Sequence, residues 1–278
     1  MRYSAFAVAA CFVATLHVAG NASANQRHYT YIYETATLPM GAVEIEPWTT
    51  VRLMREDYYV RFDHRLEFEM GLLDNFQAAL YINWFEEAAA DHAADSISDP
   101  FGFSGISLEF KGKLLDPVAD PIGLGLYFEI GAEPTELEFE GKILVDKVMG
   151  NVGIAFNAVY ELELEAKVDG PKDETNLEIK AHEMQFDLGV AWFMSPRWSF
   201  ALELVSRTEF AIDEKDEFET VYSILSLGPT VTYGGEHFWI ATTVLPQIAA
   251  LKGATGDSIQ HLEDKEALEI RLLLGFDL

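Results

Sequence analysis

The stretch that decides the fold is LEIRLLLGFDL, residues 268–278 at the end of the chain. Apolar and polar residues alternate along it, and successive side chains of a β-strand point to opposite faces. One face carries Leu268, Ile270, Leu272, Leu274, Phe276 and Leu278, and the other carries Glu269, Arg271, Gly275 and Asp277. A strand of this kind suits a wall with lipid on one side and water on the other, as in a transmembrane β-barrel.

The same alternation recurs through about a dozen segments of roughly ten to fifteen residues. The segments that we expect to be strands are 42–54, 58–70, 76–85, 105–115, 122–132, 136–147, 152–165, 177–193, 198–211, 219–233, 237–248 and 264–278. Short turns alternate with mostly longer polar links, which is typical of barrels with short periplasmic turns and longer extracellular loops. The sequence therefore predicts an all-β fold over residues 41–278: a closed antiparallel transmembrane barrel of about twelve strands with up-and-down topology.

The first residues have the features of an export signal. Arg2 precedes a mostly apolar stretch at 5–18, and Ala22, Ser23 and Ala24 form an A-x-A cleavage site. Residues 1–24 are therefore predicted to be a cleaved signal peptide, and the mature protein to reach the bacterial outer membrane. The alternative reading, a lipobox at 8–11, has an unusually short apolar run before Cys11. Cys11 is the only cysteine, so its loss with the signal leaves no disulfide or thiol site.

Composition narrows the choice of fold and partner. A formal net charge of −27 over 278 residues excludes nucleic acid as a natural partner. After the signal there is no run of about 18 apolar residues that could cross a bilayer as a helix, so a barrel is the membrane-spanning fold that remains. A soluble periplasmic β-protein can have the same composition, and the alternation is what separates the two readings.

The cost of burying charge in lipid predicts which face of each strand points outward. A charged side chain on the lipid face costs up to about 2–4 kcal/mol near the midplane. In segment 152–165, residues such as Ile154 and Phe156 should therefore face lipid, while Asn157 and Glu161 face the lumen. In segment 122–132 the even-numbered apolar residues should likewise face outward.

Two features interrupt the regular pattern. The alternation changes phase between Ala181 and Met184, which predicts a β-bulge, with a wrongly drawn strand boundary as the alternative. The stretch 86–95 contains five alanines and is predicted to form a short helix within a loop.

Two stretches resemble a group of uncharacterised Gram-negative outer-membrane barrel proteins of the porin or transporter kind. They are YTYIYETATLPMGAVEIEPWTTVR at 29–52 and YYVRFDHRLEFEMGLLDNFQAALYINW at 58–84. The resemblance covers about a third of the mature chain well and implies a location and a fold, but no catalytic residues. The chain ends on Leu278 rather than the terminal Phe usual in such barrels, and this apolar ending remains compatible with recognition by the barrel-assembly machinery.

Acidic residues dominate the faces expected to point into the lumen. The predicted acidic cluster at the extracellular mouth consists of Glu136, Glu138, Glu140, Glu161, Glu163 and Glu165. Basic side chains expected to reach it from neighbouring strands are Arg61, Arg65, Lys142, Lys180 and Arg207. Carboxylates about 7 Å apart along one strand face repel each other, so they need counter-charges, mobile cations or protons. The cluster is thus either a cation-attracting pathway or metal site, or a hydrated wall of ion pairs.

Aromatic residues gather where strands should meet lipid headgroups, and two girdles are predicted. The expected girdle residues are Tyr58, Trp84 and, beside periplasmic turns, Trp192, Trp198 and Trp239. Ahead of the first strand, residues 25–40 carry Tyr29, Tyr31 and Tyr33 at alternate positions. This segment is expected either to fold inward as a plug, to add to the wall, or to remain in the periplasm.

The function expected from these features is passive transport. No His is followed two positions later by Ser, the spacing of outer-membrane phospholipases, so no catalytic, cofactor or metal residues are assigned and an enzyme acting on lipid or peptide is the less favoured reading. We expect a narrow channel or transporter for cations or small polar solutes. The alternative is a non-conducting structural barrel whose acidic loops bind divalent cations that bridge it to lipopolysaccharide or a partner protein. Expected partners are outer-membrane lipid and lipopolysaccharide, and the assembly machinery through the C-terminal strand.

Overall fold

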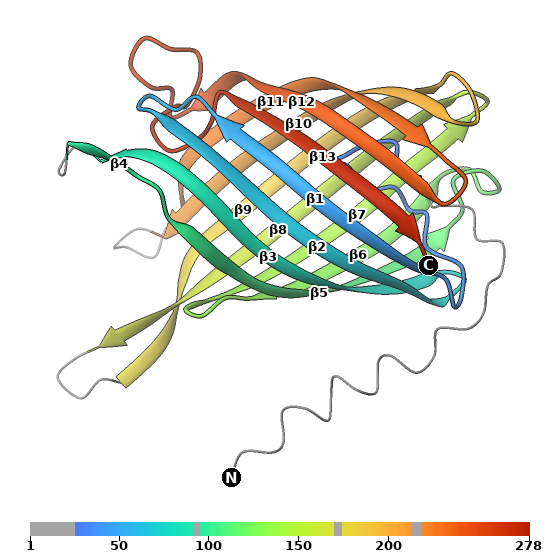
Figure 1. Cartoon of the computed structure of the whole chain (residues 1–278), viewed down its shortest axis with the longest axis horizontal. Coiled ribbons are helices and arrows are strands. Elements are labelled where there is room, and N and C mark those ends of the chain that lie inside the picture. Colours follow the sequence, from blue (N-terminus) through green and yellow to red (C-terminus); the bar gives the residue numbers. More distant parts are fainter. Residues whose placement is uncertain (1–25, 92–94, 170–173, 213–217) are drawn as a thin grey trace.

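A computed structural model of the chain describes residues 26–91, 95–169, 174–212 and 218–278, and every strand in it belongs to one sheet. The strands are β1 (Val43–Leu53), β2 (Tyr59–Leu73), β3 (Phe76–Asp91), β4 (Ser96–Ser98), β5 (Phe101–Leu115), β6 (Gly123–Ala132), β7 (Glu136–Met149), β8 (Val152–Asp169), β9 (Glu174–Phe193), β10 (Trp198–Ile212), β11 (Phe218–Gly234), β12 (Phe238–Lys252) and β13 (Leu268–Asp277). Each barrel strand pairs with its two neighbours, and β1 pairs with β13 to close the ring (Figure 1).

The predicted fold class is confirmed. The sheet has thirteen strands, and β4 pairs only with β3, so twelve antiparallel strands make the closed wall. All twelve predicted strands are present, with ends that differ from the prediction by up to six residues. In the described part of the chain there is no helix of the length and apolarity needed to span a membrane. The predicted signal peptide, including Cys11, lies outside the described residues.

The two ends of the barrel carry different connections between strands. The first strand begins and the last strand ends at the same end of the barrel. The turn end carries the short connections at 74–75, 116–122, 150–151, 194–197 and 235–237, and β1 begins and β13 ends there. The loop end carries the other links, such as 54–58 and 253–267. These two names are used below.

The predicted helix at 86–95 is wrong where the structure describes it. Residues 86–91 continue β3, and Ala89 is paired with Tyr59 of β2. The amide of Ala90 also donates a 3.0 Å hydrogen bond to the carbonyl of Tyr58. The helix propensity of alanine is worth only a few tenths of a kcal/mol per residue, less than the pairing of an adjacent strand supplies.

The predicted facing is confirmed by exposure. On β8, Ile154 and Phe156 point outward and Asn157 is completely buried toward the lumen. On β6, Leu126 and Phe128 are exposed whereas Tyr127 is buried. The change of phase on β9 is a register shift: Ala181 pairs with Glu163 and Ile179 with Leu164, so Lys180 is the extra residue. The bulge thus lies one residue before the predicted interval.

The lipid face permits a first test. Leu108 lies at the middle of β5 and is exposed on the outer surface between neighbours of the same kind. We expect Leu108→Arg to lower the free energy of unfolding in lipid by about 2–4 kcal/mol, the cost of a cation near the bilayer midplane. Urea unfolding in lipid vesicles measures it. Ile97→Arg is the matched control because β4 lies outside the closed wall; equal effects of the two changes would contradict the assigned facing.

Candidate functional site in the barrel lumen

Residues 26–42, which we call the N-terminal segment, run through the lumen, and only residues 39–41 of the segment are exposed. Tyr29, Ile32 and Leu38 are no more than 2% exposed, although none of them belongs to a strand. Tyr29 and Ile32 pack with inward-facing alanines of the neighbouring strands β8, β9 and β10. Leu38 reaches a different part of the wall, where its amide is bound by Gln77 of β3. The segment therefore fills the turn-end half of the lumen, where its blue trace runs within the barrel (Figure 1).

The carboxylate of Glu203 on β10 is the main anchor of this segment. Its oxygens accept three consecutive backbone amides, from Thr30 at 2.9 Å, Tyr31 at 2.8 Å and Ile32 at 3.2 Å. The hydroxyls of Thr230 and Thr243 donate to the same carboxylate. Glu203 is 0% exposed, and hydrogen bonds to a charged group are among the stronger ones in proteins. One side chain thus fixes the path of residues 30–32.

Three further side chains hold the rest of the segment to the wall. Asn157 of β8 exchanges two hydrogen bonds with the backbone of Tyr33, at 2.7 and 2.9 Å. Asp146 of β7 accepts the amide and hydroxyl of Thr35. Gln77 of β3 accepts the amide of Leu38 at 2.9 Å. The backbone groups of a segment with no strand partner are in this way satisfied by lumen side chains, as burial requires.

Close approach of the segment to the wall depends on a small residue. A Cβ atom at Gly189 of β9 would lie 2.5 Å from the ring of Tyr29. The Tyr29 hydroxyl donates to the carbonyl of Gly153 on β8 at 3.2 Å. The absence of a side chain at Gly189 therefore lets the large ring of Tyr29 approach the inner wall.

A charged pair closes the first turn of the segment. His28 Nδ1 lies 2.9 Å from Glu34 Oε1. Burial alone would lower the pKa of His28, but the neighbouring Glu34 carboxylate raises it above the usual value. Burial likewise opposes the charge of Glu34, and His28 nevertheless lowers the pKa of that carboxyl. The pair therefore favours its charged form and holds residues 28–34 together.

Above the segment, the loop-end half of the lumen contains a cavity of about 740 Å³. Tyr31 and Tyr33 of the segment form part of its wall. Guanidinium and ammonium groups stack on these rings, with Arg271 3.8 Å from the centre of Tyr31 and Lys142 4.1 Å from that of Tyr33. Twelve acidic and nine basic side chains line the cavity. Its volume falls in the range of small-molecule sites, about 300–1,000 Å³, but its wall is far more charged than theirs.

The acidic residues concentrate on one side. The strands β7 and β8 set Glu136 opposite Glu165, Glu138 opposite Glu163 and Glu140 opposite Glu161. Five of the six predicted acidic residues line the cavity; Glu165 does not, because it lies beyond the cavity toward the loop end. We call these five the acidic wall: Glu136, Glu138, Glu140, Glu161 and Glu163.

Only two of the five predicted basic partners contact the acidic wall. Lys180 lies 2.8 Å from Glu136 and 3.2 Å from Glu163, and Lys142 lies 2.9 Å from Glu140. The other three point into the lumen but pair elsewhere: Arg61 with Asp63 at 2.6 Å, Arg65 with Glu129 at 3.3 Å and Arg207 with Glu269 at 2.5 Å. These three expected pairings are wrong because each arginine has another acid within reach: one on its own strand for Arg61, and one across the lumen face for Arg65 and Arg207.

The arginines occupy the other side of the cavity. We call Arg52 of β1, Arg61 and Arg65 of β2, and Arg271 of β13 the arginine wall; all four line the cavity. Arg52 joins Asp63 at 2.5 Å and lies 3.6 Å from Glu266. In the ring of twelve strands β8 lies diametrically opposite β1, and β7 opposite β13. The acidic wall therefore faces the arginine wall across the cavity.

The predicted aromatic girdles are partly wrong. Tyr58, Trp192 and Trp198 are 55%, 48% and 41% exposed. Trp84 stacks on His64, with ring centres 5.3 Å apart. Trp239, however, is 0% exposed and donates a hydrogen bond from its indole to Glu44. The adjacent Phe238 is 40% exposed, so strand alternation turns Trp239 into the lumen.

The sequence places one histidine on each of two predicted strands, at 64 and 182, and a third in a loop, at 92; the two that the structure describes do not form a common site. His64 is paired with Thr49 at 3.0 Å and lies within the stack of Phe62 and Trp84. His182 is within 2.6 Å of the Tyr160 hydroxyl beside the bulge. The third, His92, lies outside the described residues.

The comparisons with known proteins agree with this architecture. A family model described as a family of unknown function (DUF6662) matches residues 21–278. The chain belongs to this family. A search of curated proteins finds no match.

Two solved structures share the fold at low sequence identity. The COG4313 outer membrane channel from Pseudomonas putida F1 is similar with a TM-score of 0.67 and 11% identity, over 90% of this chain and 100% of the other. The NanC porin has a TM-score of 0.53 and 8% identity, over 85% of this chain and 100% of the other. This family member therefore has the barrel fold of outer-membrane channels and porins, as the sequence resemblance implied.

Proposed function

We propose that the protein is an outer-membrane channel for small polar solutes that favours cations, and that the N-terminal segment closes it in the conformation described. In this proposal the loop end faces the cell exterior, lipid and lipopolysaccharide surround the wall, and the C-terminal strand β13 is the element that the assembly machinery recognises. The fold shared with a channel and a porin supports the location.

The observation that carries the proposal is the charge distribution of the cavity. A structural barrel gains nothing from a hydrated, charge-lined space of about 740 Å³. Charges of opposite sign on facing walls create a strong field across a narrow space bounded by low-dielectric material. Such a field orients polar solutes and rejects apolar ones, which are the properties of a selective diffusion path.

The preference for cations follows from the pairing of the two walls. Every residue of the arginine wall except Arg271 is already paired with a nearby acid, such as Asp63 or Glu129. Within the part of the chain that the structure describes, the acidic wall has Lys142 and Lys180 as its ion-pair partners. Glu138 and Glu161 in particular lie toward the cavity with no ion pair to a described residue. The net field of the cavity is therefore negative, and a mobile cation is its natural counter-charge.

The channel can be tested by planar-bilayer recordings in a salt gradient, made with the refolded mature protein and with a chain that lacks residues 26–38 of the closing segment. We expect Glu138→Gln with Glu161→Gln to lower the cation-to-anion permeability ratio about threefold or more, since each change removes an unpaired charge from the path. Glu236→Gln is the control, because Glu236 lies on the turn at 235–237 and its side chain is 88% exposed. A reversal potential unchanged by the double substitution would contradict the assigned selectivity.

The anchoring of the N-terminal segment favours a second candidate function, that of a structural barrel that does not conduct. A segment held by Glu203, Asn157, Asp146 and Gln77 is a substantial part of the lumen core. A structural barrel that never conducts would need such a filling. Insertion of folded protein without conductance, in the full chain and in a chain lacking the segment, would establish that alternative.

A further inference from the structure

Five carboxylates form a compact group in the turn-end half of the lumen, away from the acidic wall. On β1 and β2, Glu44 lies directly opposite Glu69, and Glu46 lies opposite Glu67. Glu69 and Glu109 of β5 are both in register with Ala79 of β3. Since the alanine between them is short, the two carboxylates can meet over it. All five glutamates are at most 5% exposed.

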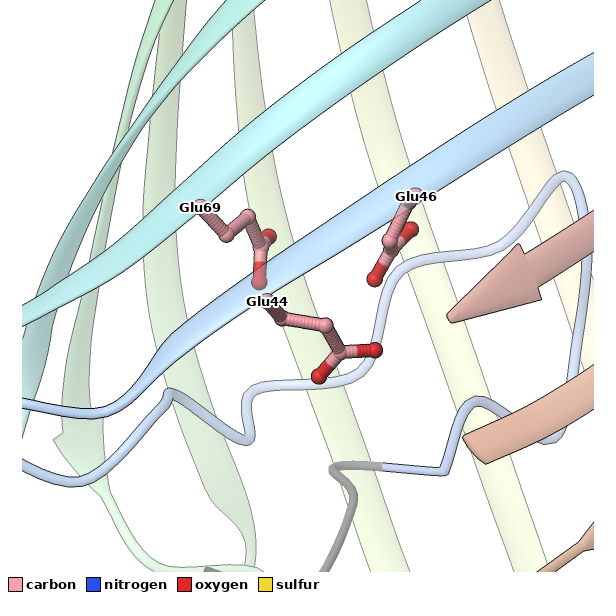
Figure 2. A group of neighbouring side chains, drawn as sticks. All are labelled: Glu44, Glu46 and Glu69. Carbon is pink, nitrogen blue, oxygen red and sulfur yellow. The ribbon is translucent and has the colours of Figure 1, made fainter. Parts of the chain in front are cut away.

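The carboxylate oxygens converge on two overlapping points. Oxygens of Glu44, Glu46 and Glu69 lie within 4.8 Å of one another, and so do oxygens of Glu67, Glu69 and Glu109. Figure 2 shows Glu44 and Glu46 projecting from β1 and Glu69 from β2 into one space. Glu69 is common to both sets, so the five residues make one group, which we call the deep glutamate cluster.

Protein partners satisfy only part of the cluster. Glu44 accepts the indole of Trp239, Glu46 accepts that of Trp48 at 3.2 Å, and Glu69 accepts Gln77 at 2.5 Å. Arg27 lies 3.7 Å from Glu46. Three oxygens, however, have no hydrogen-bond partner in the described structure: Oε2 of Glu44, Oε2 of Glu67 and Oε1 of Glu109. Glu67 is 1% exposed and its carboxylate reaches to within 4.8 Å of two others.

Buried carboxylates with free oxygens need a positive group between them. Burial of an uncompensated charge is costly. One arginine at contact distance, together with the nearby Lys111, leaves most of the charge of five carboxylates uncompensated. Oxygens that lie within 4.8 Å of one another can share one ion at roughly 2.3–2.6 Å, the Ca²⁺–oxygen distance. An all-carboxylate set without His or Cys selects hard cations over transition metals. Mg²⁺ usually keeps several waters and binds through one or two carboxylates, so a group of five buried carboxylates suits Ca²⁺ better.

We propose that the deep glutamate cluster is a Ca²⁺ site. The inference stands apart from conduction: it holds for an open, a closed or a purely structural barrel. Bound Ca²⁺ stabilises the anchoring of the N-terminal segment, because Arg27 pairs with Glu46 and Gln77 joins Glu69 to the amide of Leu38.

The two indoles beside the cluster provide a direct readout. Trp239 and Trp48 hydrogen-bond to its carboxylates, so excitation of tryptophan should sensitise the emission of Tb³⁺ bound in place of Ca²⁺. The mature protein is unfolded in the presence of chelator to remove bound metal, and the chelator is then removed. Portions of it are refolded in detergent with Tb³⁺ alone or with Tb³⁺ and increasing CaCl₂. The expected result is saturable emission from about one Tb³⁺ per chain that Ca²⁺ displaces.

Substitutions assign the emission to the cluster. Glu67→Gln with Glu69→Gln should weaken Tb³⁺ binding at least tenfold while keeping side-chain volume and an acceptor for Gln77. Glu138→Gln with Glu161→Gln removes the same charge from the acidic wall and should leave the emission unchanged. Equal weakening by both pairs would show general accumulation of ions in an acidic lumen and overturn the proposal.

A second measurement keeps the test decisive if the substituted chain does not fold. The unchanged protein should resist thermal unfolding to a higher temperature in CaCl₂ than in chelator, because a ligand that binds only the folded state stabilises it. Absence of this shift together with absence of Ca²⁺-displaceable Tb³⁺ emission overturns the proposal and leaves protonation as the way in which the cluster is neutralised.

Discussion

Deletion of residues 26–38 should convert the barrel into an open pore. The segment fills the turn-end half of the lumen, and its removal leaves a twelve-stranded wall whose interior is wider than that of the packed eight-stranded barrels. We expect the single-channel conductance of the refolded variant to exceed that of the full mature chain by at least about tenfold, in line with the water-filled interior of wider barrels. Planar-bilayer recordings of both proteins at the same salt concentration measure it.

The control for the deletion is the state of the wall. Barrel strands β1 to β13 do not need the segment for pairing, since the ring closes between β1 and β13. The variant should therefore retain its β-sheet circular dichroism and its heat-modifiable migration in gels. A folded variant that conducts no better than the full chain would show that the lumen is closed by other residues.

Most strands of the barrel wall could be predicted from the sequence because the same physical constraint, contact with lipid on one face, acts on each strand. Lipid on one side penalises every inverted charge, so the alternation in segments such as 122–132 and 152–165 fixes both the strand and its facing. The girdle position predicted for Trp239 is wrong because the alternation of its strand turns this side chain into the lumen. Phe238 and Trp239 are adjacent aromatic residues, and either one satisfies a girdle, so the pattern alone does not reveal which one faces outward.

The interior was less predictable because nothing periodic describes it. Tyr29, Tyr31 and Tyr33 alternate as in a strand, but the backbone of these residues is bound by side chains such as Glu203 and Asn157 instead of by a neighbouring strand. Their partners lie more than a hundred residues away in the sequence. The acidic wall, in contrast, comes from two consecutive strands with a short link, so its position was visible as two runs of alternating glutamates. The deep glutamate cluster combines β1, β2 and β5 and needs the register to be seen.

Glu203→Ala should release the N-terminal segment without unfolding the barrel. The substitution leaves the amides of Thr30, Tyr31 and Ile32 without their acceptor inside the lumen. Each buried donor that loses its partner costs about 1–3 kcal/mol, so three of them outweigh the local contacts that hold residues 30–32. The segment then exchanges its bonds to the wall for bonds to water, whereas pairing of β10 with β9 and β11 involves backbone groups that the change does not touch.

Hydrogen exchange of the segment measures this release. We expect protection of the amides of residues 30–32 to fall by about a hundredfold, equivalent to roughly 2.7 kcal/mol at 1.36 kcal/mol per factor of ten, together with a rise in conductance toward that of the deletion variant. Glu203→Gln keeps one acceptor oxygen and should give an intermediate loss. Glu209→Ala is the matched control on the same strand, because Glu209 pairs with Lys265 at 3.7 Å near the loop end. Unchanged protection in Glu203→Ala would mean that Asn157, Asp146 and Gln77 hold the segment on their own, and Glu203 would then be a buried charge that the segment serves to neutralise rather than its anchor.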